Sequence, residues 1–600
     1  MRLRFFEYFT LLILSLFLSS CDKEGSFREV VTHKKNHDIY RKKLELKLGM
    51  PLPRLKKLNY PLIMGRRLNR DELELGRLLF NDTILSRNND VSCATCHLSN
   101  HGFADGNSLT VGAGGVGGPH GDNIGKKFGE GSLSTKRSLG DFSFGHVSHQ
   151  FMFRNSLSTL NVGYRVKKAN NQGLFWDGRF GSLFFQVLLP IHTPEEMCGT
   201  NPIVLDENGK NPFAEGGLFF PKPVRIDHAN SYDEFTGRDS GNFNAQPITI
   251  KGIPYRRRNN QISIPNRNEC LALALSKVSQ VPRYQKLFKK AYGKETEISD
   301  KTLAMALQAF LMTHVADNSP YDQFIKGKNS MSLSELKGMV AFFLDVGETL
   351  EVENESIRGA GCYSCHSGGQ FGGEKYAGIG VKSDFRSSTT RVNQETTESS
   401  GFFDRRRTQR GELPNCHIKD KTSISGFGPD MGHASVSLNK DDCFKLRVPP
   451  LRNVIETFPY FHHGTGKLRG RKKENFFELS YDALKEAIDY HLAGIENIGQ
   501  KNRLSPLNPY YDPYEQRDVL IPIFFISPSS ETGLIKADLT KEERDDLYQF
   551  VAFSLWDKDA VKKGSLGNDI SHPKYVPSGL TPSITRDNGH QLELVNGQKK

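Results

Sequence analysis

The chain contains two short runs with the same spacing, Cys93-Ala-Thr-Cys-His97 and Cys362-Tyr-Ser-Cys-His366. Each is a C-x-x-C-H sequence, which is the attachment signature of a c-type haem. Two thiols one helical turn apart add across the two vinyl groups of the porphyrin, and the next histidine becomes the fifth ligand of the iron. We therefore expect two covalently bound haems, with His97 and His366 as iron ligands. The attaching residues are Cys93, Cys96, Cys362 and Cys365.

Two other interpretations of a C-x-x-C pair are a zinc site and a thioredoxin-type redox pair. A zinc site would need further cysteine or histidine residues at paired spacing. A redox pair would not need a histidine directly after its second cysteine, and both runs have one. The haem interpretation is therefore preferred for both runs.

Composition limits the class of protein. The chain has 600 residues, of which 37% are apolar and 10% aromatic, which is enough to bury a core and predicts two to four domains. The net charge is +12, but 80 basic residues are mixed with 68 acidic ones, whereas a nucleic-acid-binding protein would show clustered lysine and arginine. We interpret this charge as favouring solubility and a mild attraction to an acidic partner or surface. After the N-terminus there is no apolar run of about 20 residues, which excludes a membrane protein with several spans.

The first residues have the pattern of an export signal. Arg2 and Arg4 precede a continuous apolar run, as in a signal peptide. The sequence Leu18-Ser-Ser-Cys21 then resembles a bacterial lipobox, in which the cysteine is lipidated and becomes the mature N-terminus. An ordinary cleaved signal and a short uncleaved anchor are the alternatives. We predict a signal peptide over residues 1–20, a polar tether over residues 21–60, and a lipid-anchored protein in the periplasm.

Four cysteines remain outside the haem motifs and the lipobox. An even number of cysteines in an oxidising compartment indicates two disulfides. The simplest of the three pairings joins Cys198 to Cys270 and Cys416 to Cys443.

The patterning predicts a mainly α fold with two cytochrome-c-like haem domains and long loop insertions. Helices are expected from apolar periodicity or from N-caps at Leu73–Phe80, Leu271–Val278, Ser299–Leu311, Leu333–Phe343, Leu484–His491 and Thr540–Leu555. Each haem motif lies between an early helix and a late one, and no sustained alternation indicates a large sheet. The predicted domains are residues 61–320, with an insertion at about 200–265, and residues 321–565, with an insertion at about 380–440. Residues 566–600 are expected to be a loose tail.

Further phrases follow the motifs in an order that makes the chain resemble the bacterial di-haem cytochrome c peroxidases and the related di-haem enzymes that mature methylamine dehydrogenase. These phrases are Leu85-Ser-Arg87, Phe175-Trp-Asp-Gly-Arg179, Glu196-Met197, Leu451-Arg-Asn453 and Pro459-Tyr-Phe-His462. The resemblance covers approximately residues 68–197, 268–375 and 440–557. It implies an N-terminal haem that binds and cleaves peroxide and a C-terminal haem that accepts electrons from a donor.

The resemblance also implies catalytic residues in the first half. Trp176 matches a tryptophan that assists electron transfer between the haems, although its type and position alone would indicate a core residue. Glu196 matches the carboxylate that moves a proton between the two oxygens of peroxide, with Gln186 nearby to position the substrate and Glu195 as the fallback. From spacing alone, Gln186 would lie on a polar helix face, and Glu196 would form a capping box with Thr193.

Candidate sixth ligands of the two irons differ between the halves. His149 lies where the family carries a histidine that blocks the peroxidatic iron in the resting oxidised state, and its alternative is a solvated loop histidine. At the second haem, many relatives have methionine and the maturation enzymes have tyrosine, but the matching position here is His491, with Tyr490 and Met431 as rivals. Imidazole is a stronger donor than a thioether, so we expect a lower potential and doubt the usual role of high-potential acceptor.

The family also holds a calcium ion between its domains, through an asparagine side chain, backbone carbonyls and waters. The matching residues are Asn155, Thr457 and Pro459, and the same phrase would place His462 near the second haem. Asn155 alone would be an ordinary loop residue.

Together these observations predict a peroxidase that reduces hydrogen peroxide with electrons from a small cytochrome c or cupredoxin. One alternative keeps the haems but acts as a di-haem oxidase on a protein or organic molecule, and another is an electron-transfer cytochrome with no catalytic site. Relatives are often homodimers, so a homodimer is a further expectation, while no nucleic-acid partner is expected.

Overall fold

The structure is a computed structural model, and it describes the parts of the chain that surround both haem motifs. These are residues 37–87, 89, 91–106, 154–165, 173–198, 267–373, 375–379, 432–437, 439–442, 445–462, 464, 476–493 and 534–580, with the pairs 511–512, 517–518, 586–587 and 592–593. Several expectations fall outside these residues and remain predictions. They concern residues 1–20, Cys21, His149, the insertion at 200–265, Met431 and the pair Cys416–Cys443.

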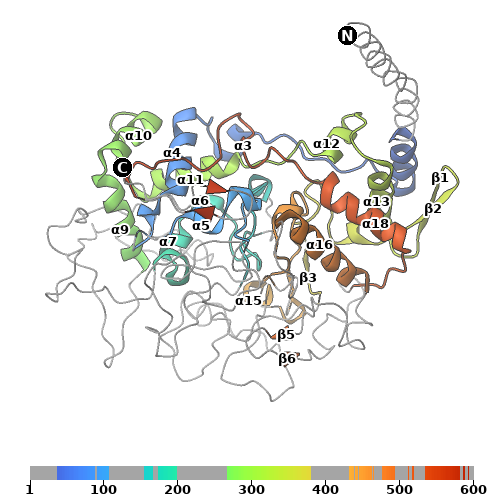
Figure 1. Ribbon diagram of the computed structural model, residues 1–600. Coiled ribbons are helices and arrows are strands. Elements are labelled where there is room, and N and C mark those ends of the chain that lie inside the picture. The colour runs from blue at the N-terminus through green and yellow to red at the C-terminus, as the bar shows by residue number, and fades with distance from the viewer. Residues whose placement is uncertain are drawn as a thin grey trace, which may run out of the picture.

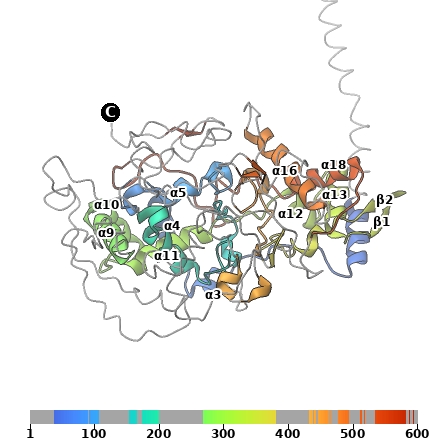
Figure 2. The same ribbon diagram turned by 90° about the horizontal axis from the view of Figure 1, so that it is seen from below.

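The helices gather in two lobes, each with its own buried apolar core (Figure 1). The first lobe contains α4 (Arg70–Asn81), α9 (Arg267–Gln280), α10 (Pro282–Tyr292) and α11 (Asp300–Met312). The second lobe contains α12 (Pro320–Ile325), α13 (Leu333–Phe343), α16 (Phe476–Ala493) and α18 (Lys541–Gln549). The two groups also lie side by side in the view turned by 90° (Figure 2).

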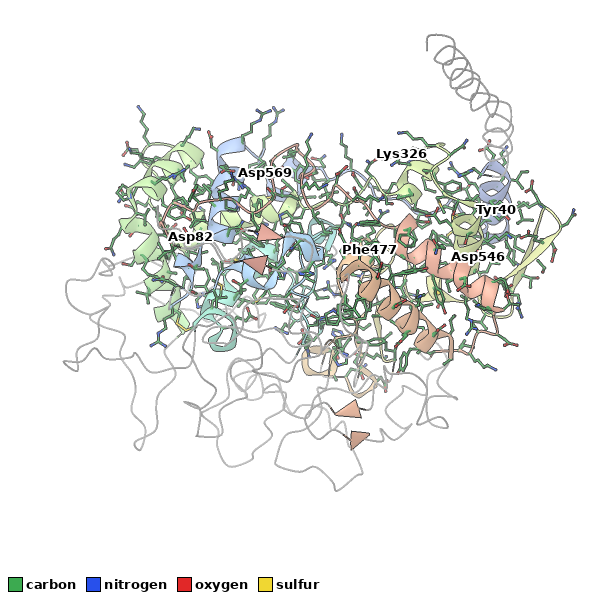
Figure 3. All side chains as sticks on the ribbon, in the orientation of Figure 1. Tyr40, Asp82, Lys326, Phe477, Asp546 and Asp569 are labelled. Carbon is green, nitrogen blue, oxygen red and sulfur yellow. A yellow bond between two sulfur atoms is a disulfide. The ribbon has the colours of Figure 1, made fainter. Side chains whose placement is uncertain are left out.

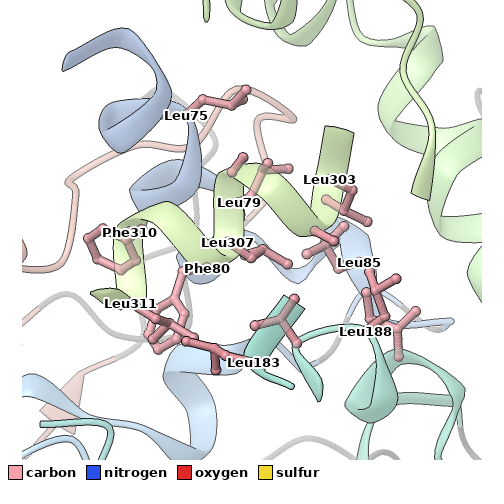
Figure 4. Packing of buried hydrophobic residues seen from close by; sticks show 14 of the residues in the cluster. Leu75, Leu79, Phe80, Leu85, Leu183, Leu188, Leu303, Leu307, Phe310 and Leu311 are labelled. Carbon is pink, nitrogen blue, oxygen red and sulfur yellow. The ribbon is translucent and has the colours of Figure 1, made fainter. Parts of the chain in front are cut away.

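Both lobes are built on a pair of closely crossing helices. In the first lobe α4 crosses α11, and a side chain on Gly76 would collide with the carbonyl oxygen of Ala306. In the second lobe α13 crosses α18, and a side chain on Gly338 would collide with the carbonyl oxygen of Asp546. A glycine at each crossing therefore allows the two backbones to approach. Around the first crossing, leucine and phenylalanine side chains from α4, α6 (Leu183–Gln186) and α11 interdigitate (Figure 4).

The helix starts follow from local sequence. Ser299 and Thr302 form a capping box at the start of α11, and Thr540 and Glu543 form one at the start of α18. A capping box stabilises a helix end because each side chain accepts a hydrogen bond from an otherwise unpaired backbone N–H. Both predicted starts are therefore confirmed.

Extended structure in the described residues is limited to two-stranded pairs. The longest is the antiparallel hairpin of β1 (Thr349–Val352) and β2 (Glu355–Arg358), in which Thr349 lies opposite Arg358. The other pairs are β3 (Tyr376–Ala377) with β4 (Leu446–Arg447), β5 (Tyr511–Asp512) with β6 (Arg517–Asp518), and β7 (Arg586–Asp587) with β8 (Leu592–Glu593). The predicted mainly α fold is confirmed.

Short helices and single turns connect these elements. They are α3 (Tyr60–Met64), η1 (Thr83–Leu85), α5 (Cys93–Cys96), η2 (Ser99–His101), η6 (Val162–Arg165), α7 (Leu189–His192), η7 (Pro194–Cys198), η8 (Cys362–Ser364), α15 (Ala434–Ser437), η10 (Lys440–Asp442), η11 (Val454–Glu456) and η13 (Phe550–Ser554). Among the described residues, no helix has both the length and the apolar character needed to cross a membrane.

The N-terminal segment is not a free tether from residue 37 onward. Residues 37–48 form a helix, and Tyr40 and Leu44 are buried in the core of the second lobe. The hydroxyl of Tyr321 donates a 2.8 Å hydrogen bond to the carbonyl of Pro53. We call residues 37–55 the N-terminal strap, because they are tied to the second lobe before the chain enters the first.

The C-terminal segment makes the reverse crossing, and residues 566–580 are not a loose tail. We call residues 556–580 the C-terminal strap. It runs from the second lobe back over the first, where Ala560 and Ile570 enter the apolar core and the hydroxyl of Ser578 donates a 2.7 Å hydrogen bond to Asp82. Figure 3 shows Asp569 of this strap on the same lobe as Asp82. The prediction of a loose tail was wrong for residues 566–580, because their few apolar side chains pack one by one and leave no periodic pattern in the sequence.

Candidate haem sites and the region between them

The first motif forms the short helix α5, which follows directly from the first lobe's helix pair. Ser92 and Thr95 form a capping box at its start, so Cys93 and Cys96 lie one turn apart. The Nδ1 atom of His97 lies 3.0 Å from the carbonyl oxygen of Phe103 and 3.2 Å from the hydroxyl of Ser156. A neutral imidazole with Nδ1–H donated to a carbonyl presents Nε2 for a metal. Burial lowers the pKa of His97, which keeps the ring in that neutral form.

The second motif repeats this arrangement. The Nδ1 atom of His366 lies 3.2 Å from the carbonyl oxygen of Phe371. Phe103 and Phe371 are both buried, and both have left-handed backbone φ angles, 59° and 55°. This conformation is uncommon for a large side chain. In each half, the backbone therefore bends to direct a carbonyl at the imidazole of the haem motif.

A second histidine faces His366. The ring centroids of His366 and His491 are 6.4 Å apart. Two metal–nitrogen bonds of about 2 Å each, with about 1.1 Å from each nitrogen to its ring centre, would separate the centroids by roughly 6 Å. The Nδ1 atom of His491 lies 2.7 Å from the carbonyl of Ala487, one turn earlier in α16. Both rings are thus oriented by backbone carbonyls and spaced for one iron between them.

Tyr490, the rival candidate for the sixth ligand, makes a hydrogen bond to another segment. The hydroxyl of Tyr490 donates a 2.7 Å hydrogen bond to the carbonyl of Ile379. Burial, and next the neighbouring His491, lower the pKa of His366 to about 4. A histidine must be neutral to bind a metal, and the lowered pKa keeps His366 in that form.

The first motif has a carboxylate in its neighbourhood, whereas the second has an imidazole facing its histidine. Phe80 lies near His97, with ring centroids 6.4 Å apart. The buried His314 is also close, because its ring stacks on Phe103 at 4.2 Å and, after burial, the charge of His97 lowers its pKa. Glu196 is close enough to the first motif that, after burial, its negative charge helps to raise the pKa values of the Cys93 and Cys96 thiols, the former to about 12. The structure therefore brings Glu196 to the first haem motif and His491 to the second.

The turn that carries Glu196 is fixed from both sides. The N–H groups of Glu196, Met197 and Cys198 all donate to the carbonyl of Thr193, which makes η7 a π-type turn. Cys198 forms a disulfide with Cys270 of α9, so this predicted pairing is confirmed. The carbonyl of Met197 accepts a 3.0 Å hydrogen bond from the N–H of Arg87, in the loop that leads to the first motif.

The capping alternative for this segment is not what the structure shows. The hydroxyl of Thr193 donates a 2.8 Å hydrogen bond back to the carbonyl of Leu189, and the N–H of Glu196 donates to the Thr193 carbonyl instead of the hydroxyl. Gln186 ends α6, just before α7, and is half-buried. The side chain of Glu195 lies outside the described residues.

Trp176 lies where the two lobes meet. Its indole Nε1–H donates a 2.8 Å hydrogen bond to the carbonyl of Asn155. Its own carbonyl accepts a 2.7 Å hydrogen bond from the N–H of Arg447 in the second lobe. Its ring lies edge-on to His462, with centroids 6.3 Å apart. The indole is thus buried and held by segments from both haem-bearing lobes.

The comparisons with known proteins agree with this arrangement. A sequence model of the family described as "Di-haem cytochrome c peroxidase" matches residues 70–215 and 255–330, which include the first motif. Cytochrome c551 peroxidase of Nitrosomonas europaea is 22% identical over 397 residues, covering 66% of this chain and 70% of that protein. The cytochrome c551 peroxidase of Pseudomonas aeruginosa is 22% identical over 404 residues, covering 67% and 70%.

Over these two stretches, residues 70–215 and 255–330, the chain is similar to the di-haem cytochrome c peroxidase family. Methylamine utilization protein MauG of Methylorubrum extorquens is 23% identical over 315 residues, covering 52% of this chain and 54% of that protein. Among solved structures, a MauG-like protein associated with microbial copper homeostasis has a TM-score of 0.45 and 17% identity, covering 87% of this chain and 97% of that one. The matched relatives are named cytochrome c peroxidases, and the matching family model describes di-haem proteins, in agreement with the two C-x-x-C-H motifs of this chain.

Asn155 contacts the second lobe through both its side chain and its backbone. Its side-chain Nδ2 lies 2.6 Å from the carbonyl oxygen of Pro459, and its backbone N–H donates to the carbonyl of His462. The Oδ1 atom is buried with no hydrogen-bond partner. The two ends of an amide are assigned from their surroundings, so the reversed amide would direct Oδ1 and the Pro459 carbonyl at one point. Two converging oxygens fit a hard cation such as calcium.

The proposed calcium ligands are neutral amide and carbonyl oxygens, not charged side chains. No group of three or more His, Cys, Asp or Glu residues that could hold a metal ion occurs within the described ranges. Thr457, the third predicted ligand, follows η11, and its hydroxyl donates a 3.0 Å hydrogen bond to the carbonyl of Val454. Its own carbonyl is the group that the resemblance assigns to the cation.

A buried ionic cluster lies directly after Trp176. Asp177 pairs with Arg154 at 2.8 Å and Arg179 at 3.0 Å. Burial opposes ionisation of Asp177, but the two guanidinium groups outweigh it and hold the pKa of this carboxyl well below its usual value. The carbonyl of Asp177 lies 2.7 Å from Nδ1 of His433, whose ring stacks on Tyr376 at 3.7 Å. The Trp-Asp-Gly-Arg phrase is therefore a rigid joint between the lobes.

Several residues of these sites were not found from the sequence. They are Phe103, Phe371, His314, whose ring stacks on that of Phe103 with centroids 4.2 Å apart, and Arg447, whose N–H bonds to Trp176. The two phenylalanines follow the motif histidines by six and five residues, and this shared spacing could have been noticed. The others come from distant segments and have no local pattern.

Proposed function

We propose that this protein reduces hydrogen peroxide to water with electrons from a small cytochrome c or cupredoxin. In this proposal the His97 haem is the peroxide site and the His366 haem is the entry site for electrons. The observation that carries the proposal is the difference between the two sites. His491 faces His366 at ligand spacing, whereas Glu196 is the group near the first motif.

The bound haem iron supplies the coordination position for peroxide and the electrons that cleave its O–O bond. The chain supplies the protons. One peroxide takes up two protons and two electrons to give two waters, so a proton must move from the inner oxygen to the outer one as the bond breaks. Glu196 is proposed to make this transfer, and the disulfide two residues later holds its turn against α9. Gln186 is proposed to orient peroxide through its carboxamide.

Trp176 is proposed to assist electron transfer between the haems. Its hydrogen bonds reach Asn155 on one side and Arg447 on the other. A buried indole fixed by both lobes keeps a constant distance to each haem, which a mobile side chain would not.

A di-haem oxidase that acts on a protein or organic substrate is the second candidate function. It is favoured by His491, because an imidazole ligand stabilises ferric iron more than methionine does. A haem at lower potential is a poorer electron acceptor and can store oxidising equivalents instead. A simple electron carrier would not need Glu196 at the first motif.

Calcium, the cellular location and assembly complete the proposal. Asn155, Thr457 and Pro459 are proposed to bind one calcium ion between the lobes. Cys21 is proposed to carry the lipid that anchors the protein at the periplasmic face of a membrane, which mass spectrometry of the N-terminal peptide tests; an unmodified Cys21 would contradict it. A homodimer is proposed from the family resemblance, and a monomer mass in light scattering would contradict it.

The deciding experiment measures peroxide loss with a reduced small cytochrome for wild type and Glu196→Gln. Loss of the acid–base group should reduce turnover by a factor on the order of 10² to 10⁴, while the low-spin spectrum of the His366 haem stays unchanged. Glu195→Gln is the matched control and should retain turnover. Unchanged turnover in Glu196→Gln would sink the acid–base assignment, and loss only in Glu195→Gln would move it to Glu195.

A further inference from the structure

Two buried arginines near the second haem motif lack the partners that such residues normally have. Arg165 ends η6 in the first lobe, and Arg447 lies in β4. Their exposed fractions are 8% and 2%. A buried guanidinium is costly unless an anion and hydrogen-bond acceptors compensate its charge.

Their contacts in the structure are neutral. Arg165 donates to the carbonyl of Leu160 at 3.3 Å and to the side-chain oxygen of Gln370 at 3.4 Å. Arg447 donates to the carbonyl of Gly173 at 3.3 Å, and its Nε has no acceptor. Neither guanidinium forms an ion pair with a carboxylate in the described part of the chain.

Another buried arginine, Arg452, is paired with a carboxylate. Arg452 forms two hydrogen bonds to Asp322, at 2.6 and 2.8 Å. In contrast, burial and next the charge of Arg447 lower the pKa of Arg165, and burial lowers the pKa of Arg447 to about 10 against the opposing effects of Tyr376 and Asp177. The charge of Arg447 acts on Arg165, so the two guanidinium groups lie in the same region. Asp177, whose charge reaches Arg447, is already paired with Arg154 and Arg179. A further anion that carries about two negative charges would therefore balance Arg165 and Arg447.

The surroundings identify where that anion comes from. Gln370, the partner of Arg165, lies in the loop between His366 and Phe371 that orients the motif histidine. Arg447 precedes Pro449 by two residues, and the backbone carbonyl of Pro449 interacts with the imidazole of His366. The backbone N–H of Arg447 donates to the carbonyl of Trp176. Both cations therefore lie between the second haem motif and the tryptophan.

We propose that Arg165 and Arg447 bind the two propionate carboxylates of the haem attached at Cys362 and Cys365. The inference rests on the haem attachment stated under the proposed function. Guanidinium and carboxylate groups are complementary in shape and charge, and each pair can form two parallel hydrogen bonds. The pairing neutralises the propionates, so it raises the potential of this haem and opposes the lowering caused by His491.

The test is a spectroscopic redox titration of the isolated two-haem protein, which needs no peroxide turnover. In Arg447→Gln and Arg165→Gln, an uncompensated propionate favours ferric iron. We expect the reduced-to-oxidised ratio of the His366 haem, at a fixed applied potential, to fall about tenfold or more, which corresponds to 59 mV for one electron. Arg447→Lys keeps the positive charge but cannot form two parallel hydrogen bonds to one carboxylate. The reduced-to-oxidised ratio should therefore fall less in this variant. Lys328→Gln removes an exposed charge from the same lobe and should change the ratio less than twofold.

Three outcomes would overturn the assignment. The glutamine variants could titrate like wild type, the His97 haem could shift instead, or Lys328→Gln could shift the His366 haem equally. If the glutamine variants do not fold, wild type still tests the proposal: paired propionates should leave the potential of the His366 haem nearly constant from about pH 5 to 8, and a steady fall with rising pH would contradict it. A wild-type protein without two covalent haems would instead show that the proposed function itself is wrong.

Discussion

The two haem sites of this protein use the same support and differ on the opposite face. At both motifs the histidine Nδ1 lies against the carbonyl of a buried phenylalanine with a left-handed backbone, Phe103 or Phe371. Opposite His366 is His491, whereas the group brought to the first motif is Glu196. The attachment motif therefore fixes where a haem sits, and residues from distant segments decide what each haem can do.

The difference has a local cause in each half. His491 sits on α16, an 18-residue helix whose own carbonyl orients the ring. Glu196 sits on a single π-type turn held by a disulfide. A long helix holds a ligand side chain at a fixed distance from the iron, which suits a sixth coordination position that stays occupied. A short pinned turn leaves room beside the carboxylate, as a substrate needs.

The largest predicted effect comes from making the second site resemble the first. In His491→Ala the sixth position is vacated, and we expect the low-spin spectrum of that haem to become high-spin. In His491→Met a weaker donor replaces imidazole, so the potential should rise by on the order of 0.1 V within the roughly 0.8 V range of axial ligation. Optical and EPR spectra of the half-reduced protein measure both changes.

The matched control is Tyr490→Phe, which removes a hydroxyl bonded to Ile379 and should leave the spectrum unaltered. A six-coordinate low-spin haem in His491→Ala would mean that another side chain is the ligand, and the contrast between the two sites would then be lost.

A smaller effect is predicted for Glu456, a carboxyl that lies against the loop of the first haem motif and not against that of the second. Glu456 is half-buried, accepts a 2.8 Å hydrogen bond from Asn453, and lies against Gly102, directly before Phe103. Burial raises the pKa of Glu456 to about 7, and the hydrogen bond from Asn453 opposes this only in part. The folded state thus binds a proton that the unfolded chain releases near pH 4.5. The resulting stability is fully present below pH 4.5 and is lost as the pH rises towards 7.

From this shift we expect a loss of at most about 3 kcal/mol between pH 4.5 and 7. Glu456→Gln should remove this part of the pH dependence and unfold at a higher temperature than wild type at pH 8. Denaturant unfolding at several pH values, in EGTA so that no bound cation contributes, measures it. Parallel pH profiles for wild type and variant would refute the raised pKa.

The smallest predicted effect concerns the cation between the lobes. If Asn155 and Pro459 bind calcium, EGTA should lower the free energy of unfolding by about 2.7 kcal/mol when free calcium was 100 times its Kd. Calcium, but not magnesium, should restore it. Asn155→Ala should be insensitive to EGTA, and an equal EGTA effect in this variant would place the cation elsewhere.

Local patterns allowed the haem motifs, the main helices and the Cys198–Cys270 disulfide to be predicted. The caps at Ser299 and Thr540 act within a few residues, so they are readable in the chain. The pairing of His366 with His491 was reached only through a family resemblance, because the two lie 125 positions apart. Nothing in their neighbours identifies Arg165 and Arg447 as buried, since their environment is assembled from four distant segments.

The two straps were not predicted for the same reason. Ala560 and Ile570 are scattered apolar residues in a polar segment, and their burial depends on a surface formed almost 500 positions earlier, around Phe80. Sequence periodicity describes a face that repeats along one element. It does not describe single side chains that fill gaps in another lobe.

The crossing straps determine how this protein can be divided. A cut near Asn318, where the two haem regions join, would give an N-terminal fragment without Ala560 and Ile570 and a C-terminal fragment without Tyr40 and Leu44. Each fragment would expose an apolar patch that the other is built to cover. Single-haem versions for spectroscopy are therefore better made by replacing motif cysteines in the intact chain than by expressing either half alone.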